Sequence, residues 1–512
     1  MAVAKVYSAQ NDINNSSVIE IESDLSRGLF SFAIVGLPDK AVAEAKDRVS
    51  AAIKNSGFDS PKSGNKKVVI SLAPADIKKE GPSFDLPIAL SYLLSSGEIK
   101  FDPKYKMFLG ELALNGDVRK VKGVLPSVIL AKKKGFREIF VPKENANEAS
   151  LVDDIKVFGV NNLKEIINHF RENNSEFKKE ILPWQREELN TVFDEAENDF
   201  AYIKGQNIAK RALEIAAAGG HNVLFYGPPG TGKTMLAKAF ITILPDLYYE
   251  EMLDTTSIHS VAGILDGDKI SKAPFRSPHH TSSHVAIVGG GVNLRPGEIT
   301  LAHNGVLFLD EFPEFDRRVI ESLREPLEEG KISVSRAKGT AVFPAKITLL
   351  AAMNPCPCGN YGSLKNCTCS AITIGRYQRK ISGPILDRID LIVPVEELKR
   401  KELSEEKKEI SSKIIKEKIE NARKFQKERF KKLGLKYSLN KDIKPKHIKE
   451  GSLIDEKAFK LLLDSTEKLS LSTRTFHRMI RVARTIADLE NSEKITPSHI
   501  LEALQFRGKI SG

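Results

Sequence analysis

A glycine-rich octet gathers several phosphate-binding groups in one short loop. Residues 227–234 read GPPGTGKT, after an apolar run at 223–226 and before a helical pattern at 235–240. A strand, a glycine loop and a helix in this order are the context of a phosphate-binding loop. In such a loop the backbone N–H groups face the phosphates, the lysine reaches the β- and γ-phosphates, and the threonine hydroxyl ligates Mg²⁺. The octet therefore predicts ATP binding by Gly227, Pro228, Pro229, Gly230, Thr231, Gly232, Lys233 and Thr234.

A pair of acidic residues follows a buried-strand pattern further along the chain. Residues 305–309 read GVLFL, and Asp310 and Glu311 come directly after them. Downstream of a phosphate-binding loop, the aspartate would complete the Mg²⁺ shell with Thr234, and the glutamate would polarise the attacking water. A strand that merely ends in two solvated acids is the structural alternative. The combination with the octet favours ATP hydrolysis.

Four more polar residues are candidates for the same site. Asn354 ends the apolar run at 347–353, and a polar residue at the tip of a neighbouring strand can orient the lytic water. Arg388 lies in GPILDRID, and Arg474 begins a helical pattern near the C-terminus. Taken alone, either arginine is more typical of a surface or a salt bridge. Gln206, which precedes the core, is predicted to help enclose the adenine.

All four cysteines of the chain lie in the string CPCGNYGSLKNCTC, as Cys356, Cys358, Cys367 and Cys369. In a reducing compartment such a cluster indicates metal ligands rather than disulfides. Four thiolates make a closed tetrahedral zinc site. The alternative is four unligated thiols, which rarely cluster so completely. We expect one structural Zn²⁺.

The composition sets the broad class. The chain has 512 residues, of which 41% are hydrophobic, and this length fits about three globular domains. No apolar stretch approaches the ~20 residues that span a bilayer, and the first residues lack the pattern of a signal peptide. We therefore expect a cytoplasmic protein with no membrane contact. The net charge of +11 suits a partner that carries phosphates, although lysine-rich composition alone can produce it.

Composition and periodicity divide the chain into four parts. Residues 1–175 mix strand patterns with amphipathic helices such as 40–55, and residues 176–199 are a polar, charged linker. Residues 200–395 alternate strands and helices, which predicts an α/β core with a parallel sheet flanked by helices. Residues 396–512 are helical, with apolar residues at helical spacing in the last sixty.

Two further segments lie inside the predicted core. Residues 331–343 alternate around a Lys-Gly turn and predict a β-hairpin that carries Arg336 and Lys338 near its tip. A long segment with the string PFRSPHH precedes the Asp-Glu strand. Its His279 and His280 could ligate a metal, but no partner cluster is near in the sequence, so packing or hydrogen bonding is preferred.

The order of these motifs resembles the plan of AAA+ ATPases, a P-loop core with a C-terminal helical lid. The resemblance implies that Asn354 is sensor 1, Arg388 is a finger acting on the neighbouring subunit, and Arg474 is sensor 2. An arginine finger typically contributes about 10³–10⁵ in rate. A finger that acts on a neighbour requires a ring, so the resemblance implies a homo-oligomer, most often a hexamer.

The hairpin and the PFRSPHH segment resemble the insertions of one AAA+ branch, which includes magnesium chelatase and replicative helicase ATPases. In that branch such loops often line the pore of the ring. We therefore hypothesise that Arg336 and Lys338 track a DNA backbone. A solvated hairpin is the alternative.

Six strings together resemble the ComM/YifB-type magnesium chelatase-like AAA+ proteins of bacteria: GPPGTGKT, PFRSPHH, GVLFLDEF, LREPLEEG, AAMNPCPCG and ISGPILDRIDL. The strings AIVGLPD and LAPAD extend the resemblance to the N-terminal part. The resemblance implies a hexameric, ATP-driven helicase that migrates branched DNA while single strands are integrated by recombination in natural transformation, so the implied partner is branched or single-stranded DNA.

The N-terminal domain of this family resembles the Lon protease domain, an α+β fold. The string KEGPS echoes the segment that carries Lon's nucleophilic serine, here Ser83. The lysine of a Ser–Lys dyad would stand where this chain has Ser127. We therefore interpret the domain as a non-proteolytic scaffold or DNA-binding fold. A Lon-type protease or remodeller and a chelatase motor that acts on a protein partner stay as alternative functions.

Overall fold

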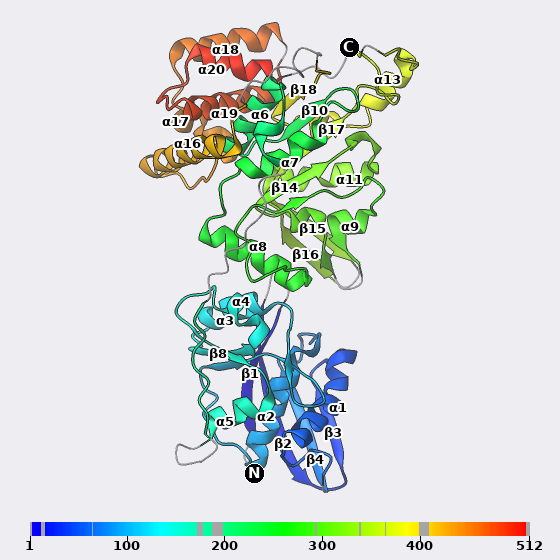
Figure 1. Cartoon of the computed structure of the whole chain (residues 1–512), viewed down its shortest axis with the longest axis vertical. Coiled ribbons are helices and arrows are strands. Elements are labelled where there is room, and N and C mark those ends of the chain that lie inside the picture. The colour runs from blue at the N-terminus through cyan, green and yellow to red at the C-terminus, as the bar shows by residue number, and fades with distance from the viewer. Residues whose placement is uncertain are drawn as a thin grey trace. The chain divides into compact units, whose positions relative to one another are not determined.

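The computed structural model describes residues 3–11, 16–63, 65–171, 178–186, 198–291, 294–336, 339–363, 365–398, 409–469 and 471–507. The chain forms two compact units (Figure 1). Unit 1 comprises Met1–Thr191 and Tyr249–Ile270, and unit 2 comprises Val192–Tyr248 and Ser271–Gly512. In the part of the chain that the structure describes, no helix has both the length and the apolar character needed to cross a membrane.

A four-stranded sheet with two packed helices forms the first half of unit 1. Its strand order is β1-β2-β4-β3, and β3 is parallel to β4 while the other neighbours are antiparallel. The elements are β1 (Ala4–Gln10), β2 (Ser17–Arg27), β3 (Ser31–Val35), α1 (Lys40–Asn55), β4 (Lys66–Ala73) and α2 (Asp85–Ser96). Apolar residues alternate in β2, so Ile19 and Ile21 are both buried. The helix predicted over residues 40–55 is confirmed as α1.

The second half of unit 1 is a three-stranded parallel sheet of order β5-β8-β9. Its elements are β5 (Lys106–Phe108), β6 (Glu111–Leu112), β7 (Val118–Arg119), α3 (Val124–Lys133), β8 (Glu138–Pro142), α4 (Ala146–Ala149), β9 (Lys156–Val160) and α5 (Leu163–Phe170). Part of the segment predicted to be a linker packs here. The Trp184 indole N–H donates to Asn147 Oδ1 at 2.6 Å, and the Trp184 backbone N–H donates to Val157 O at 2.7 Å.

Helix α8 (Tyr249–Ala262) belongs to unit 1, although in the sequence it lies between the phosphate-binding loop and Asp310. The Gly123 N–H donates to Ser260 O at 3.2 Å, and the Ser260 hydroxyl donates to the Glu148 carboxylate. Ser260 and Glu148 are buried, and burial raises the pKa of Glu148. A helix from the predicted ATPase segment therefore completes the packing of unit 1.

Unit 2 is built on a five-stranded parallel sheet of order β11-β14-β17-β10-β18. The strands are β10 (Val223–Tyr226), β11 (Phe275–Arg276), β14 (Gly305–Leu309), β17 (Ile347–Met353) and β18 (Leu391–Pro394). β14 is buried along its whole length, as expected of a central parallel strand covered on both faces. The predicted α/β class with a parallel sheet flanked by helices is confirmed.

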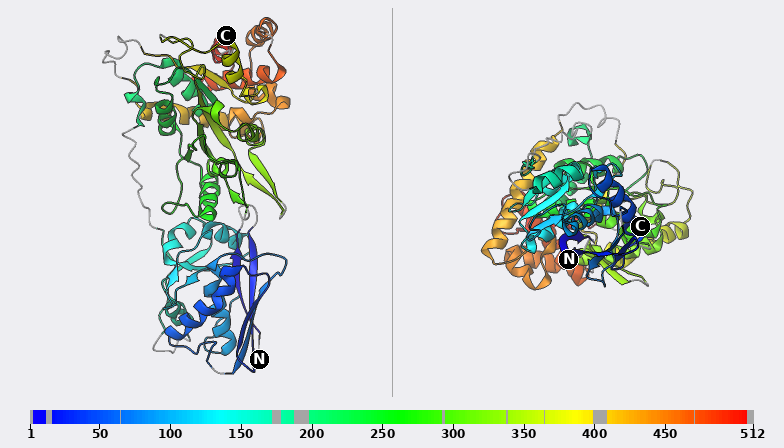
Figure 2. Two further views of the ribbon diagram at one scale, coloured as in Figure 1. Left: turned by 90° about the vertical axis from the view of Figure 1, so that its right-hand side faces the viewer. Right: turned by 90° about the horizontal axis from the view of Figure 1, so that it is seen from below.

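Helices and a hairpin surround this sheet. They are α6 (Asn207–Gly219), α7 (Lys233–Ile243), α9 (His284–Val288), β12 (Gly289–Gly290), β13 (Arg295–Pro296), α10 (Glu298–Leu301), α11 (Arg317–Ser322), α12 (Arg324–Glu329), β15 (Lys331–Arg336), β16 (Gly339–Pro344), α13 (Ala371–Gln378) and α14 (Gly383–Leu386). β15 pairs with β16 antiparallel, which confirms the predicted hairpin, and Figure 2 shows it extending away from the sheet. Lys338 and the side chain of Arg336 lie outside the described residues.

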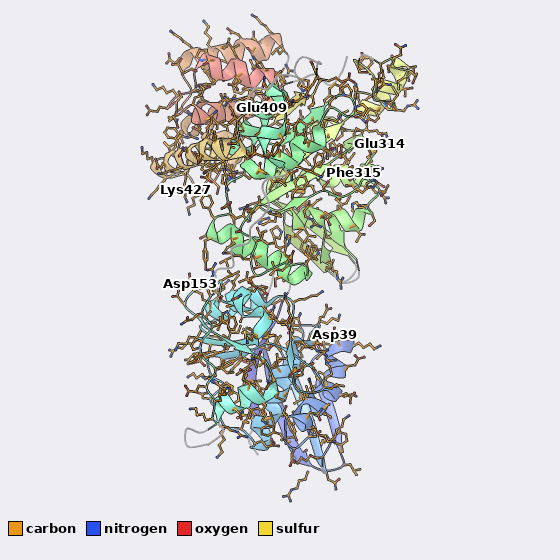
Figure 3. All side chains as sticks on the ribbon, viewed as in Figure 1. Asp39, Asp153, Glu314, Phe315, Glu409 and Lys427 are labelled. Carbon is orange, nitrogen blue, oxygen red and sulfur yellow. The ribbon has the colours of Figure 1, made fainter. Side chains whose placement is uncertain are left out.

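The C-terminal part of unit 2 is helical, as predicted. Its helices are α16 (Ser412–Lys432), α17 (Ile448–Ser452), α18 (Glu456–Lys468), α19 (Thr473–Leu489) and α20 (Pro497–Gln505). Lys210 of α6 pairs with Glu409, labelled in Figure 3, at 2.6 Å. A buried carboxylate, Asp488, links α16 with α19. It accepts hydrogen bonds from Arg429 at 3.1 Å, from Arg484 at 3.0 Å and from Asn440 at 2.8 Å.

Replacing Asp488 by alanine is expected to destabilise unit 2 strongly. Arg429 and Arg484 are buried beside it, and removing one partner of a buried ion pair leaves uncompensated charge, which costs about 3–5 kcal/mol. Urea unfolding followed by circular dichroism measures the loss. Asp464→Ala, at an exposed position on α18, is the control and is expected to stay within about 0.5 kcal/mol of the parent. A loss of less than about 1 kcal/mol for Asp488→Ala would contradict this account.

Candidate nucleotide site

The phosphate-binding loop, residues 227–234, connects β10 to α7 in the predicted order. Gly227 is required by a close approach, because a Cβ there would lie 2.0 Å from the carbonyl oxygen of Val395. Gly232 caps α7 with φ of 88°, a left-handed conformation that favours glycine. The loop thus brings the N-terminus of an 11-residue helix to the carboxyl edge of the sheet, where it can bind an anion.

Lys233 is buried, and its ammonium group is held by three oxygen atoms. Nζ donates to Gly227 O at 2.8 Å, to Pro228 O at 2.7 Å and to Asn354 Oδ1 at 3.2 Å. Burial lowers the pKa of Lys233 to about 8, and the charge of Asp310 opposes part of this shift. The structure therefore brings Lys233 and Asn354 together, as the sequence predicted for one site.

Thr234 and Asp310 present oxygen atoms side by side. The Thr234 hydroxyl donates to Asp310 Oδ2 at 2.7 Å, and Asp310 Oδ1 accepts the backbone N–H of Glu311 at 2.9 Å. Hydroxyl and carboxylate oxygens are the ligand types that Mg²⁺ takes together with phosphate oxygens. The pair of residues therefore fits the Mg²⁺ of a bound Mg·ATP.

Glu311 has a partner that the sequence did not indicate. His280 Nδ1 lies 3.0 Å from Glu311 Oε2, and Glu311 itself has a left-handed backbone with φ of 51°. The His280 ring also packs against His279 and edge-on against Phe315, which Figure 3 labels beside Glu314. The preference for hydrogen bonding over metal ligation at His280 agrees with this contact. No motif spacing could have singled out the pair, because 31 residues separate the two positions.

A cavity of about 240 Å³ lies beside the phosphate-binding loop. Its lining includes Tyr202, Ile203, Gln206, Met235 and Leu398. Gln206 Nε2 donates to Glu396 O at 2.8 Å, so its side chain is fixed at the wall. The lining also includes Thr231 and Gly232 of the phosphate-binding loop, and outside that loop only Gln206 was predicted from the sequence. The apolar pair Tyr202-Ile203 just before Gly205 was the available signal, and an apolar wall suits a flat base such as adenine.

The two candidate arginines are not part of this cluster. Arg388 Nη1 donates to Pro384 O at 2.6 Å, and its Nη2 pairs with Glu328. Arg474 is exposed in the first turn of α19. Among the described residues, no hydrogen bond or ion pair joins either arginine to the phosphate-binding loop.

The four cysteines form a compact group next to Asn354. Their sulfur atoms all lie within 4.8 Å of one another, and none is in a disulfide. Cys356 Sγ is 3.4 Å from Cys358 Sγ and 3.7 Å from Cys367 Sγ. Four thiolates bound to Zn²⁺ at about 2.3 Å in a tetrahedron have sulfur–sulfur distances of about 3.8 Å. The observed spacing fits such a tetrahedron, so the group could bind zinc.

Three protein families match successive parts of the chain. Residues 199–403 match the family described as magnesium chelatase, subunit ChlI. Residues 21–145 match the family described as subunit ChlI of Mg-chelatase, and residues 409–507 match magnesium chelatase, subunit ChlI C-terminal. These matches reach into both structural units.

Individual relatives match all or part of the chain. Competence protein ComM of Haemophilus influenzae is 43% identical over 518 residues, which cover 100% of this chain and 98% of the relative. The uncharacterized protein YifB of Salmonella typhimurium is 40% identical over 500 residues, which cover 96% and 94%. A more distant relative, zygotic DNA replication licensing factor mcm6-A of Xenopus laevis, is 23% identical over 62% of this chain and 36% of its own length.

The affinity for ATP is expected to fall as the pH rises above about 8. The lowered pKa of Lys233 makes its amine neutral above that pH, whereas bound phosphates favour the charged form. Binding must then take up a proton, so the Kd rises by up to about tenfold per pH unit above pH 8 and is flat below it. Fluorescent-nucleotide titrations between pH 7 and 9.5 measure this, and calorimetry in buffers of different ionisation heat measures the proton uptake. A Kd that is constant over the whole range would contradict the assignment.

Proposed function

We propose that this chain, which belongs to the ComM/YifB-type magnesium chelatase-like family of AAA+ proteins, is a DNA motor driven by ATP hydrolysis. The membership confirms the family resemblance of the sequence strings, and membership of an AAA+ family indicates an ATPase. One observation carries the proposal. At one edge of the sheet, Lys233 contacts Asn354 and Thr234 contacts Asp310.

In this proposal the residues divide the work of hydrolysis. Lys233 contacts the β- and γ-phosphates, and Thr234 and Asp310 hold Mg²⁺, which neutralises charge on the phosphate oxygens. Glu311 accepts a proton from the attacking water, and Asn354 orients that water. The contact with His280 places the Glu311 carboxylate in a defined direction near the sheet edge. Gln206 and the apolar wall around it hold the base.

A ring supplies the remaining charge. Arg388 is directed to Pro384 O and Glu328 within its own chain, and we propose that it acts on the nucleotide of the neighbouring subunit. Arg474 is proposed as the lid arginine, because it starts the helix α19 of the C-terminal bundle. The proposed assembly is therefore a homo-oligomer, and the AAA+ plan suggests a hexamer.

Branched or single-stranded DNA is the proposed substrate. The relative named competence protein ComM supports a role in natural transformation, and the relative named DNA replication licensing factor supports work on DNA. The net charge of +11 suits contact with phosphates. The motor is proposed to promote branch migration, with Arg336 and Lys338 of the β15–β16 hairpin on the DNA backbone.

The four cysteines complete the proposal as ligands of one structural Zn²⁺. Their sulfur spacing supports a closed tetrahedral site, and Cys356, two residues after Asn354, supports a location beside the ATP site.

Two other functions have less support. The family description as a magnesium chelatase subunit favours a motor that acts on a protein partner. For a Lon-type protease, Ser83 would need a lysine base, and among the described residues no hydrogen bond joins its hydroxyl to a lysine. Ser127, at the expected lysine position, is buried and donates to Gly123 O at 2.9 Å. Buried Lys79 donates instead to Pro74 O.

Glu311→Gln is expected to abolish ATP-dependent branch migration while ATP binding is retained. The amide keeps the shape of the side chain but cannot accept the proton of the attacking water, and loss of such a group typically costs about 10²–10⁴ in rate. Migration of a labelled four-way or three-strand junction measures the effect. Glu314→Gln, three residues further in an exposed turn, is the matched control and should keep migrating. ATP hydrolysis without migration in the parent protein would redirect the proposal to a protein partner.

Replacing both Arg336 and Lys338 by alanine is expected to remove the stimulation of ATPase by DNA while basal hydrolysis stays unchanged. For each DNA phosphate that the variant no longer neutralises, the slope of log affinity against log salt becomes shallower by about 0.7–0.9. DNA binding at several salt concentrations and ATPase with and without DNA provide the measurements. Lys331→Ala, at the base of the same hairpin and paired with Glu329, is the matched control. If DNA stimulates the ATPase activity of the double variant as strongly as that of the parent, the proposed contact of the hairpin with DNA is wrong.

A further inference from the structure

The chain that carries the four cysteines leaves the ATP site and returns to it. Asn354 directly follows β17, Cys356 comes two residues later, and α13 begins shortly after Cys369. At the end of α13, the backbone N–H of Asn354 lies near the buried Tyr377 hydroxyl and opposes the rise in the Tyr377 pKa that burial causes. Gln378 Nε2 donates to Pro355 O at 3.3 Å. The segment 355–378, called the cysteine loop below, is therefore closed at its base on the residue that contacts Lys233.

The cysteine loop also rests on the phosphate-binding loop. Gly359 has φ of 80°, and a Cβ there would lie 2.7 Å from Cδ and 3.0 Å from Cγ of Pro229. The Gln378 side chain also lies near the Tyr226 hydroxyl at the end of β10, where it opposes the rise in the Tyr226 pKa that burial causes. The cysteine loop therefore lies against two parts of the ATP site: the phosphate-binding loop, and Asn354 at the end of β17.

Little besides the sulfur atoms holds the shape of this loop. Pro355, Cys356, Gly359 and Tyr377 are buried, but none of its described residues between 360 and 370 is. The hydrogen bonds inside the loop are local ones within short turns. The Cys356 carbonyl accepts the Gly359 N–H at 3.0 Å, the Cys356 sulfur accepts the Tyr361 N–H at 3.4 Å, and Asn360 O accepts the Ser363 N–H at 3.1 Å. An exposed irregular segment without a core depends on a cross-link for a single conformation, and a metal bound by four thiolates is such a cross-link.

We propose that the metal-loaded cysteine loop positions Asn354 and the tip of the phosphate-binding loop, so that ATP hydrolysis depends on a soft tetrahedral cation such as Zn²⁺. This inference rests on the zinc site proposed above. When the metal is bound, Asn354 Oδ1 stays 3.2 Å from Lys233 Nζ, and Pro229 stays packed against Gly359. Loss of the metal releases both contacts. A displacement of about 1 Å of a positioning group can lower a rate by about 10²-fold.

Reversible removal of the metal from the full-length protein tests this. Zinc is withdrawn with a thiol-reactive mercurial and a chelator, both are washed out with excess dithiothreitol, and assays are run with excess Mg²⁺. The zinc-free protein is expected to hydrolyse ATP about 10–100-fold more slowly per nucleotide-binding site, and one Zn²⁺ per chain is expected to restore the rate. The number of nucleotide sites and the circular dichroism spectrum should be unchanged. Simple unfolding would instead reduce the number of sites and leave the rate per site as it was, which would overturn the proposal.

Substitutions separate the ligands from the rest of the loop. The double variant Cys367→Ser with Cys369→Ser is expected to lose zinc and to match the zinc-free rate without recovery on adding Zn²⁺. Lys365→Ala, exposed in the same loop, is expected to keep both zinc and rate. Tyr377→Phe is expected to keep zinc but to lower kcat, because it removes the hydroxyl that lies near the Asn354 backbone N–H.

The outcomes distinguish this inference from the functions on which it rests. A parent protein that neither contains nor takes up zinc would overturn the zinc site and leave the DNA motor untouched. Zinc that is bound, but whose removal leaves both kcat and nucleotide affinity unchanged, would overturn the positioning role alone. If the zinc-loaded protein hydrolyses no ATP, the proposal of an ATP-driven motor is wrong. The positioning role of the cysteine loop is then tested by whether removal of zinc changes the nucleotide affinity.

Discussion

The parallel pairing of β17 with both β10 and β14 is the contact on which the ATP site depends. Lys233, Asp310 and Asn354 lie far apart in the sequence, and no local interaction could bring them together. Tyr226 pairs with Met353 and Leu309 with Ala351, so the three strands end at the same edge. A slip of one strand by two residues would move its tip by about 6.6 Å, and a slip of one residue would turn its side chains to the other face. Either slip would separate Lys233 from Asn354.

Each of the two units is built from two separate segments of the chain. Between α7 and β11 the chain leaves unit 2, contributes α8 to unit 1 and returns, and within unit 2 the two ends are joined by the Leu247 N–H to Ser271 O at 2.9 Å. The returning segment leads through β11 to His280, which contacts Glu311. α8 ends at Ala262, 18 positions before His280 in the sequence.

The sequence could predict the elements whose signals are local. β10, β14 and β17 match their predicted runs because each is a continuous apolar stretch ended by a glycine or a polar residue, and α1 matches because its apolar residues recur at helical spacing. Long-range partners left no such signal. The approach of the Tyr377 hydroxyl to Asn354 and the contact of His280 with Glu311 join residues far apart in sequence through loops whose paths no periodicity fixes. Trp184 packs on unit 1 although its surroundings have the composition of a linker. Leu463 fits the apolar period of α18 and is nevertheless exposed.

The burial of the Lys233 ammonium group is unfavourable, and the rest of the structure must compensate for it. A buried ammonium group is unfavourable by itself, and burial lowers its pKa to about 8. The carbonyl oxygens of Gly227 and Pro228 offset part of this, but they are also the groups that phosphates would replace as partners of Nζ. A bound phosphate would therefore be a better partner for the Lys233 ammonium group than the two backbone carbonyls are. Without that phosphate the buried charge is unfavourable, and the rest of the fold must compensate for its cost in stability. On one side the buried sheet absorbs it. On the other side the support is the cysteine loop, in which no described residue between 360 and 370 is buried, and the proposed metal would cross-link this loop through the four sulfur atoms close to Asn354.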